Sequence, residues 1–326
     1  MTLSITAVVE RWPVAGQFII SRGAKTYVDV LVVAASDGAN IGFGEGTAIY
    51  YHGESAESCL AQVMSVAGDI EAMGVREARA LIQELLGAGA ARNALDCALW
   101  DLEVKQTGQP LWKLAGFTHP PVSLTTAFTI SLGEAEVMEA AAEKAAANGY
   151  GLLKLKLTGQ GDSARVAAVR KGAPEARLIV DANESWGGLD IAAEAEALEE
   201  LGVEMIEQPV PAGSDALLDT IRAPLPFVAD ESCQDSADIR RIGAFYDGIN
   251  IKLDKAGGLT EALRLADEAD AAGLRIMVGC MLSTSLGIAP AFLVAQRAEW
   301  VDLDGPALLA EDRPDGFRFE GGKIVR

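Results

Sequence analysis

The sequence has few of the residues that build zinc sites and disulfide-bonded scaffolds. Its 326 residues include two histidines, His52 and His119, and four cysteines that show no CxxC spacing. Structural zinc sites need clustered cysteine and histidine ligands, and disulfide scaffolds are dense in cysteine. We therefore expect neither a zinc site nor a disulfide framework.

Positive charge is scarce as well. The 27 lysine and arginine residues stand against 47 aspartate and glutamate residues, which gives a formal net charge of −20. Nucleic acids and anionic membranes attract basic surfaces, so we expect neither as a partner. A small anionic substrate is still compatible with this composition, because a few lysines in one place can outweigh a distant acidic surface.

Long apolar segments are also rare. The uncharged run 277–295 has the length of a membrane span, but it contains Gly279, Gly287 and Pro290 and follows the strand-like RIMVG. A buried strand, a loop and the start of a helix explain this run better. The N-terminus lacks the basic region and apolar run of a signal peptide, so we expect a cytoplasmic protein.

A regular alternation of strands and helices fills the rest of the chain. Strand-like runs begin at residues 122, 152, 177, 204, 227, 248, 275 and 300, which places them 21 to 30 residues apart. Alanine-rich amphipathic segments separate them, as in a repeated unit of one strand and one helix. The pattern predicts an α/β fold, a barrel of the (β/α)7β type that lacks its last helix.

The first part of the chain follows a different pattern. TYVDVLVVAASDG is typical of a hairpin strand, and ARNALDCALWDLEVKQTGQP of a helix that ends near Gly108. We expect residues 1–118 to form an α+β capping domain that the tail 308–326 completes, with 119–307 as the catalytic barrel. The segment GFGEG at 42–46 lacks the GxGxxG spacing of a dinucleotide loop, so no nucleotide site is expected there.

Three carboxylates follow consecutive strands at the ends where barrel enzymes carry their chemistry. Asp181, Glu207 and Asp230 end the third, fourth and fifth strand-like runs. Each alone could be a strand-end or helix-cap residue, but three in consecutive units would repel one another unless a cation lay between them. Oxygen ligands without histidine or thiolate favour Mg²⁺. The sequence therefore predicts a magnesium site.

Two lysines in LLKLKL, Lys154 and Lys156, share one face of the second strand, since side chains alternate. We expect the ammonium of Lys154 to lower the pKa of Lys156 toward neutrality, which would make it a usable base. Lys252, on the sixth strand, would face it across the ring. A cation with one lysine on each side of a substrate suits removal of a proton next to a carboxylate and its return from the opposite face.

Five separated motifs occur in the order of one known family. They are the KxK of LLKLKL, DANESW, EQP, ADES and NIKLDKAGG. The chain resembles the enolase superfamily, in its muconate lactonising enzyme subgroup, over nearly its whole length. That superfamily is known to combine a lysine or histidine base with Mg²⁺. DLDGP further resembles the dipeptide epimerases, and FIISRG and GCMLSTS resemble those of the alanyl-glutamate type.

The resemblance implies one Mg²⁺ ion, a dipeptide substrate, and the interconversion of L-Ala-D-Glu and L-Ala-L-Glu in murein recycling. The roles it implies are metal binding by Asp181, Glu207 and Asp230, proton transfer by Lys156 and Lys252, and substrate binding by Arg22, Thr129, Lys154, Met281, Asp302 and Asp304. Within that set, Asp302 and Asp304 would hold the ammonium of the substrate and Arg22 its glutamate side chain.

Other functions remain open at this point. One cap loop can redirect specificity, so an epimerase of other dipeptides is the nearest alternative. A cycloisomerase, an o-succinylbenzoate synthase or a β-elimination enzyme would use the same barrel. The resemblance argues against a cycloisomerase or a synthase, because their substrates carry no ammonium group for the two carboxylates of DLDGP to bind. A binding protein that catalyses nothing would not need both Lys156 and Lys252. The sequence leaves the oligomeric state open, a homo-oligomer included.

Overall fold

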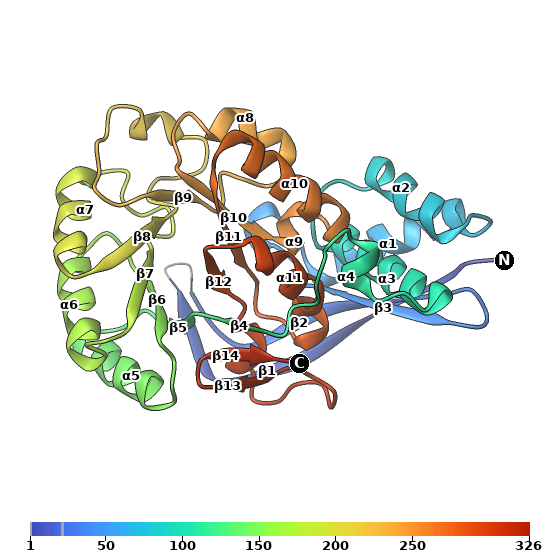
Figure 1. Cartoon of the computed structure of the whole chain (residues 1–326), viewed down its shortest axis with the longest axis horizontal. Helices are drawn as coiled ribbons and strands as arrows, with labels where there is room; N and C mark the ends of the chain where they lie inside the picture. Colours follow the sequence, from blue (N-terminus) through green and yellow to red (C-terminus); the bar gives the residue numbers. More distant parts are fainter. Residues whose placement is uncertain (1, 21–22) are drawn as a thin grey trace.

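Eight parallel strands form one sheet in the order of the sequence (Figure 1). In this computed structural model, which describes residues 2–20 and 23–326, the strands are β5 (Phe128–Ile130), β6 (Leu152–Lys156), β7 (Arg177–Asp181), β8 (Val203–Glu207), β9 (Phe227–Ala229), β10 (Gly248–Lys252), β11 (Arg275–Gly279) and β12 (Trp300–Asp302). The two edges of the sheet meet, because the backbone N–H of Ala127 donates to the carbonyl of Val301 at 2.7 Å. The prediction of a (β/α)7β-type barrel is confirmed.

Helices and short turns connect these strands on the outside of the barrel. They are α5 (Ala135–Ala147), α6 (Asp162–Gly172), α7 (Ile191–Glu200), η2 (Asp215–Leu218), η3 (Ser236–Asp238), α8 (Ile239–Ile242), α9 (Leu253–Ala256), α10 (Leu259–Ala272), α11 (Ser285–Val294) and η4 (Ala295–Arg297). After β12 only the turn η5 (Gly305–Leu308) follows, so the eighth helix is missing as expected. The uncharged run 277–295 is, as predicted, a buried strand, a loop and a helix, and none of the described helices is long and apolar enough to cross a membrane.

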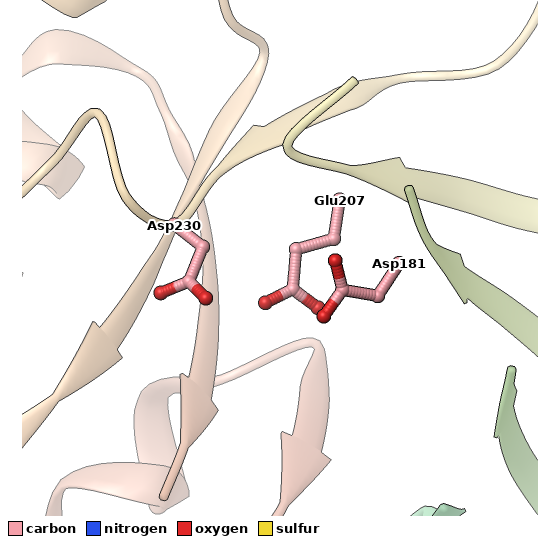
Figure 2. Close-up of side chains that lie close together, drawn as sticks. All are labelled: Asp181, Glu207 and Asp230. Atoms are coloured by element: carbon pink, nitrogen blue, oxygen red, sulfur yellow. The ribbon is translucent and has the colours of Figure 1, made fainter. Parts of the chain in front are cut away.

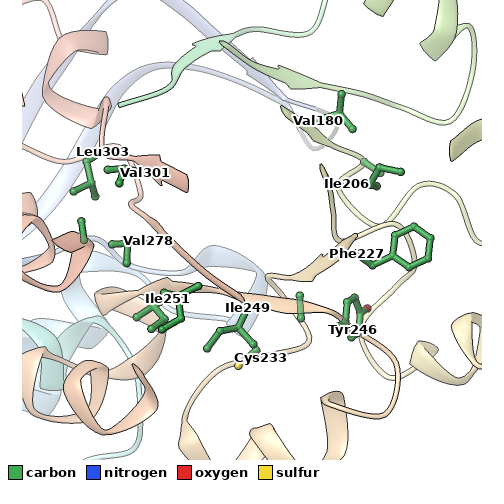
Figure 3. Close-up of a cluster of buried hydrophobic side chains, with 14 of the residues drawn as sticks. Val180, Ile206, Phe227, Cys233, Tyr246, Ile249, Ile251, Val278, Val301 and Leu303 are labelled. Carbon is green, nitrogen blue, oxygen red and sulfur yellow. The ribbon is translucent and has the colours of Figure 1, made fainter. Parts of the chain in front are cut away.

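The barrel strands carry two apolar layers, because alternate side chains point to opposite faces. Outward-facing residues such as Val180, Ile206, Ile251 and Val278 belong to the large core cluster drawn in Figure 3. Inward-facing residues form a smaller buried cluster, which we call the apolar floor: Ala127, Leu152, Ile179, Met205, Val228, Met277 and Trp300.

The apolar floor shows which side chains form the next inward layer of the barrel. Its members lie two residues before Thr129, Lys154, Asp181, Glu207, Asp230, Gly279 and Asp302, respectively. Residues i and i+2 share a face, so these side chains form the next inward layer, at the carboxyl end of the barrel. A dry apolar layer therefore lies directly beneath the predicted site residues.

The cap consists of an antiparallel sheet covered by helices. Its elements are β1 (Ser4–Ile20), β2 (Gly23–Ser36), β3 (Ile41–Gly46), η1 (Tyr50–His52), α1 (Ala56–Ile70), α2 (Val75–Leu85), α3 (Ala90–Thr107) and α4 (Leu111–Leu114). The predicted strand TYVDVLVVAASDG lies in β2 up to Ser36. The predicted helix is α3, which ends before Gly108 in the left-handed conformation. The domain boundaries themselves stay a prediction.

One expected strand, 122–130, is split in two. β4 (Ser123–Thr125) pairs with the tail strand β14 (Lys323–Val325), which forms a hairpin with β13 (Arg318–Glu320), whereas β5 joins the barrel. Between them the chain leaves one sheet for the other: Thr126 N–H donates to Gly322, and the Thr126 hydroxyl accepts the N–H of Leu303. A run of strand-forming residues does not reveal such a change of partner.

The glycines of GFGEG serve packing. A Cβ added to Gly42, Gly44 or Gly46 would lie 2.1–2.3 Å from backbone atoms of α3, which is far inside contact distance. Strand β3 therefore lies directly against α3, with glycine at every second position on the side that faces the helix. The expectation that this segment is no nucleotide loop agrees with this packing.

The cap and the barrel meet through buried polar groups. The side chain of Asn93, in α3, donates to Asp254 at 2.8 Å, and Arg92 donates to the carbonyl of Ala256 at 2.7 Å. Asp254 and Ala256 belong to α9, the turn that directly follows Lys252. Burial raises the pKa of Asp254 to about 7, although Thr47 N–H and Asn93 donate to its carboxyl group. Cap packing thus bears directly on the turn that follows a predicted catalytic lysine.

The close approach of β3 to α3 predicts the effect of one added methyl group. Gly44→Ala should lower the free energy of unfolding by about 1–3 kcal/mol, since backbone has to move to admit it. Gly68→Ala is the control, because Gly68 lies in α1 with open space around its Cβ position. Urea denaturation measures both, and equal stability of the two variants would contradict the packing argument.

Candidate active site

The three predicted metal ligands come together at the carboxyl end of the barrel. Asp181 and Glu207 end β7 and β8, and Asp230 directly follows β9. Figure 2 shows the three carboxylates converging from neighbouring strands, and one oxygen of each lies within 4.8 Å of the others. All three side chains are fully buried. We call them the acidic triad.

The acidic triad brings three negative charges together and already attracts cationic groups. Glu207 Oε2 and Asp230 Oδ1 are buried and accept no hydrogen bond from any residue that the structure describes. Ammonium groups lie 2.6 Å from the first and 2.7 Å from the second, without the alignment of a hydrogen bond. Three buried carboxylates this close repel one another, and a hard divalent ion between them would offset that repulsion. The acidic triad can therefore hold a metal ion.

Each predicted active-site lysine contacts the acidic triad. Lys156 Nζ donates to Asp181 Oδ2 at 2.6 Å, and Lys252 Nζ donates to Asp230 Oδ2 at 2.7 Å. Their strands, β6 and β10, lie four apart in the ring of eight, so the two amines approach the centre from opposite sides. The structure thus brings the two lysines to different members of the acidic triad, on opposite sides of the ring.

The third lysine has a different environment from the one that we expected. Lys154 Nζ lies 2.8 Å from Asp302 Oδ2 and is flanked by Glu207 and Asp181. Burial alone would lower the pKa of Lys154, but these carboxylates raise it well above its ordinary value. The charge that was expected to act on Lys156 is therefore neutralised largely by carboxylates. The pKa of Lys252 is likewise raised, against desolvation, by Asp230 and Glu207.

Asp302 and Asp304 form a second acidic group next to the acidic triad. Asp302 ends β12 and uses Oδ2 for Lys154, while its buried Oδ1 accepts no hydrogen bond from the described residues. Asp304 Oδ2 accepts the backbone N–H of Thr129 at 2.7 Å. Burial, with a further contribution from the charge of Asp302, raises the pKa of Asp304 to about 7. Both carboxylates would gain from a cationic ligand.

A cavity opens above these groups, between the barrel and the cap. On the barrel side its lining includes Thr129, Lys154, Lys156, Lys252, Met281, Asp302 and Asp304; the cap contributes Phe18, Lys25, Tyr50 and Tyr51. Predicted contacts Thr129 and Met281 therefore reach the cavity. Arg22 lies outside the described residues, although Phe18 and Lys25, on either side of it in the sequence, both line the cavity.

Sequence reasoning missed some residues of the site. Asn250 Nδ2 donates to Glu207 Oε1 at 2.7 Å, and its place two residues before Lys252 was a usable signal, because both share the inward face of β10. Lys255 contacts Asp230 from α9, and the sequence pattern does not predict where the side chains of this short turn point. Lys25 carried no pattern that marked it as a cavity residue.

Two family models match the chain. The mandelate racemase / muconate lactonizing enzyme N-terminal domain matches residues 2–116, and the enolase C-terminal domain-like model matches residues 136–325. The chain therefore belongs to the enolase superfamily. Its relatives carry the names of epimerases and racemases, and within the superfamily it is an enzyme of the isomerase class.

Two of the similar curated proteins act on glutamate compounds, according to their names. The L-Ala-D/L-Glu epimerase of Escherichia coli K12 is 44% identical over 315 residues, 97% of each chain. The N-acetyl-D-glutamate racemase of a Pseudoalteromonas species is 40% identical over 295 residues, 90% of this chain and 92% of that one.

Similar solved structures include complexes with dipeptides. An enolase family member from Agrobacterium tumefaciens, described with bound sodium and L-Ala-L-Glu, is 45% identical with a TM-score of 0.94 over 99% of this chain and 97% of that chain. A dipeptide epimerase from Cytophaga hutchinsonii, complexed with Mg and D-Ala-L-Val, is 27% identical with a TM-score of 0.93, covering 99% of this chain and 93% of that chain.

The acidic triad predicts a measurable affinity for Mg²⁺. Glu207→Gln should weaken binding by more than about tenfold, since even an outer partner of a metal ligand contributes about 10–100-fold. Glu204→Gln is the control on the same strand, because Glu204 pairs with Arg177 at the opposite end of β8. Titration calorimetry on metal-free protein decides the matter. Unchanged affinity in Glu207→Gln would remove this residue from the metal site.

Proposed function

We propose that this protein is a Mg²⁺-dependent dipeptide epimerase that interconverts L-Ala-D-Glu and L-Ala-L-Glu. One observation carries the proposal: two lysines on opposite sides of one cavity, an acidic triad beside them, and the pair Asp302 and Asp304 at its edge. The names of the E. coli relative and the dipeptide in the Agrobacterium structure support it.

The acidic triad would hold the Mg²⁺ ion in this reaction. When bound, such an ion supplies positive charge that stabilises a substrate carboxylate as negative charge builds up next to it. Asp181, Glu207 and Asp230 offer three buried, converging carboxylates, and an all-oxygen ligand set suits a hard cation. Lys154, protonated between Asp302 and Glu207, adds a fixed positive charge near the same carboxylate of the substrate.

The two facing lysines would move the proton. Where a cation takes up the charges of Asp181 and Asp230, which otherwise hold these lysines protonated, one of Lys156 and Lys252 can be the neutral amine. That amine would take the α-proton, and the electron pair of the C–H bond would pass into the carboxylate to give an enediolate. The other, as the ammonium, returns a proton to the opposite face of that carbon. The substrate ends inverted, with one amine protonated and one neutral, as before. Their placement on β6 and β10 supports this division of labour.

Asp302 and Asp304 favour a substrate with a free ammonium group. Asp302 and Asp304 both line the cavity, and the buried Oδ1 of Asp302 accepts no hydrogen bond from the described residues, so a cationic group of the substrate would suit this pair. The N-acetyl-D-glutamate racemase is a relevant relative, but an acetylated amine carries no positive charge. Beside a neutral amide, the carboxylates of Asp302 and Asp304 would lose water without gaining a cationic partner, which is costly. A dipeptide with a free ammonium group is therefore the better candidate substrate.

The cap would select the glutamate side chain. Lys25 reaches the cavity from β2, where its ammonium lies 4.9 Å from the ring centre of Tyr50, and burial lowers its pKa. Arg22 precedes it by three residues and is the residue that the family resemblance marks for the second carboxylate. A place in the cytoplasmic recycling of murein peptides belongs to the same proposal and rests on the resemblance alone.

The two-base arrangement predicts separate behaviour of the two lysine variants. Lys156→Ala and Lys252→Ala should each abolish epimerisation, because a proton can no longer be returned from the opposite face. Each variant should still exchange the α-proton of one epimer for deuterium, and the two variants should prefer opposite epimers. Proton NMR of L-Ala-L-Glu and L-Ala-D-Glu in heavy water follows both reactions. Normal epimerisation by Lys252→Ala would contradict the two-base mechanism.

The proposed role of Arg22 predicts different losses of activity on two classes of dipeptide. Arg22→Ala should lose about 2–4 kcal/mol of transition-state stabilisation on L-Ala-L-Glu, measured as kcat/KM, because a desolvated carboxylate would lose a bidentate partner. Turnover of dipeptides with a neutral second residue should fall far less. Equal losses on both substrates would make Arg22 structural. A wild type that prefers N-acetyl-glutamate would instead overturn the dipeptide assignment.

A further inference from the structure

Lys255 is a fully buried lysine that the proposed reaction does not use. It lies in α9, three residues after Lys252, is 1% exposed, and is not among the residues that line the cavity. Its ammonium donates to the carbonyls of Asp230, Cys233 at 2.8 Å and Asn250 at 3.1 Å. The same nitrogen lies 2.7 Å from Asp230 Oδ1. This ammonium is therefore surrounded by acceptors on two segments.

These contacts tie the loop after β9 to β10. Asp230 and Cys233 lie in that loop, and Asn250 lies in β10, so one ammonium fixes both segments at the point where the acidic triad needs them. Gln208 holds the same loop from the other side, because its Oε1 accepts the backbone N–H of Asp230 at 2.9 Å. Asp230 is thus held through its N–H, its carbonyl and its carboxylate.

The two ammonium groups that contact Asp230, those of Lys252 and Lys255, have different surroundings. Lys252 contacts Oδ2 and lines the cavity, where a substrate would meet its amine. Lys255 contacts Oδ1 and has its hydrogen-bonding capacity committed to three backbone carbonyls, so it stays in place. A residue of this kind can hold the Asp230 carboxylate in one orientation.

We propose that Lys255 is the positioning residue of the metal site: it orients Asp230 so that this carboxylate meets Asp181 and Glu207 around the cation. The inference rests on the metal site of the proposed function and assigns Lys255 no contact with substrate. It differs from a purely structural role, in which the ammonium would only satisfy the three carbonyls.

Arg92 offers a matched control within the chain. It is also a buried cation that donates to backbone carbonyls around α9, those of Ala256 at 2.7 Å and Gly257 at 3.1 Å. No contact joins it to the acidic triad among the described residues. Arg92→Met therefore removes a structural cation of the same kind without touching the metal site.

The experiment compares Mg²⁺ affinity with stability. Calorimetry should show that Lys255→Met binds Mg²⁺ about 10–100-fold more weakly than the wild type, the range for an outer partner of a metal ligand. At saturating Mg²⁺ its kcat on L-Ala-L-Glu should recover to a large extent. Arg92→Met should lose stability toward urea yet keep wild-type affinity. Where Lys255→Met does not fold, Lys255→Gln, which retains donors for the carbonyls but no charge, should show the same weakening.

Three outcomes separate the claims. Wild-type affinity in a folded Lys255 variant would overturn the inference and leave the proposed function standing. Equal weakening in Arg92→Met would also overturn it, because any loss of packing around α9 would then explain the effect. A wild type that binds no Mg²⁺ would overturn the metal site and this inference together.

Discussion

Opposite charges buried side by side, and held in register by parallel strands, are the constraint on which the site depends. Removing one such charge from water costs roughly several kcal/mol, so none can be buried there unpaired. The strand register supplies the pairs: Lys156 lies opposite Asp181 across β6 and β7, and Asp181 opposite Glu207 across β7 and β8. A shift of one residue in either pairing would turn charged side chains toward the helices. The fold and the site are thus specified together.

The apolar floor and the cap make these charges effective. The floor lies beneath the charges as a buried apolar layer, and Phe18, Tyr50 and Tyr51 of the cap line the cavity above them. Apolar surroundings lower the local dielectric and strengthen electrostatic interactions. Polar contacts fix the cap over the barrel, including Glu45, which accepts Thr284 N–H at 2.7 Å and pairs with Arg313. In the proposed function the barrel groups would bind what every dipeptide shares, and the cap would supply the variable part.

The sequence predicted the features that follow from regular spacing along the chain, such as the spacing of strands and the alternation of side chains within a strand. Strand spacing indicated the barrel, the two-residue alternation put Lys154 and Lys156 on one face, and the strand ends indicated that Asp181 and Glu207 meet. It did not predict features that depend on which segments meet in space, such as the split of 122–130, the contacts of Lys255, or carboxylates that raise the pKa of Lys154. Arg22 lies outside the described residues, so its role still rests on the sequence alone.

A crystal structure with Mg²⁺ and L-Ala-L-Glu tests the central claim most directly, that one layer of buried charges orients both metal and substrate. The account predicts Mg²⁺ between Asp181, Glu207 and Asp230, with the carboxylate at the reacting carbon turned toward it. That α-carbon should lie between the amines of Lys156 and Lys252, and the substrate ammonium should lie at Asp302 and Asp304. An α-carbon with both amines on the same face, or an ammonium directed at the acidic triad, would contradict the account.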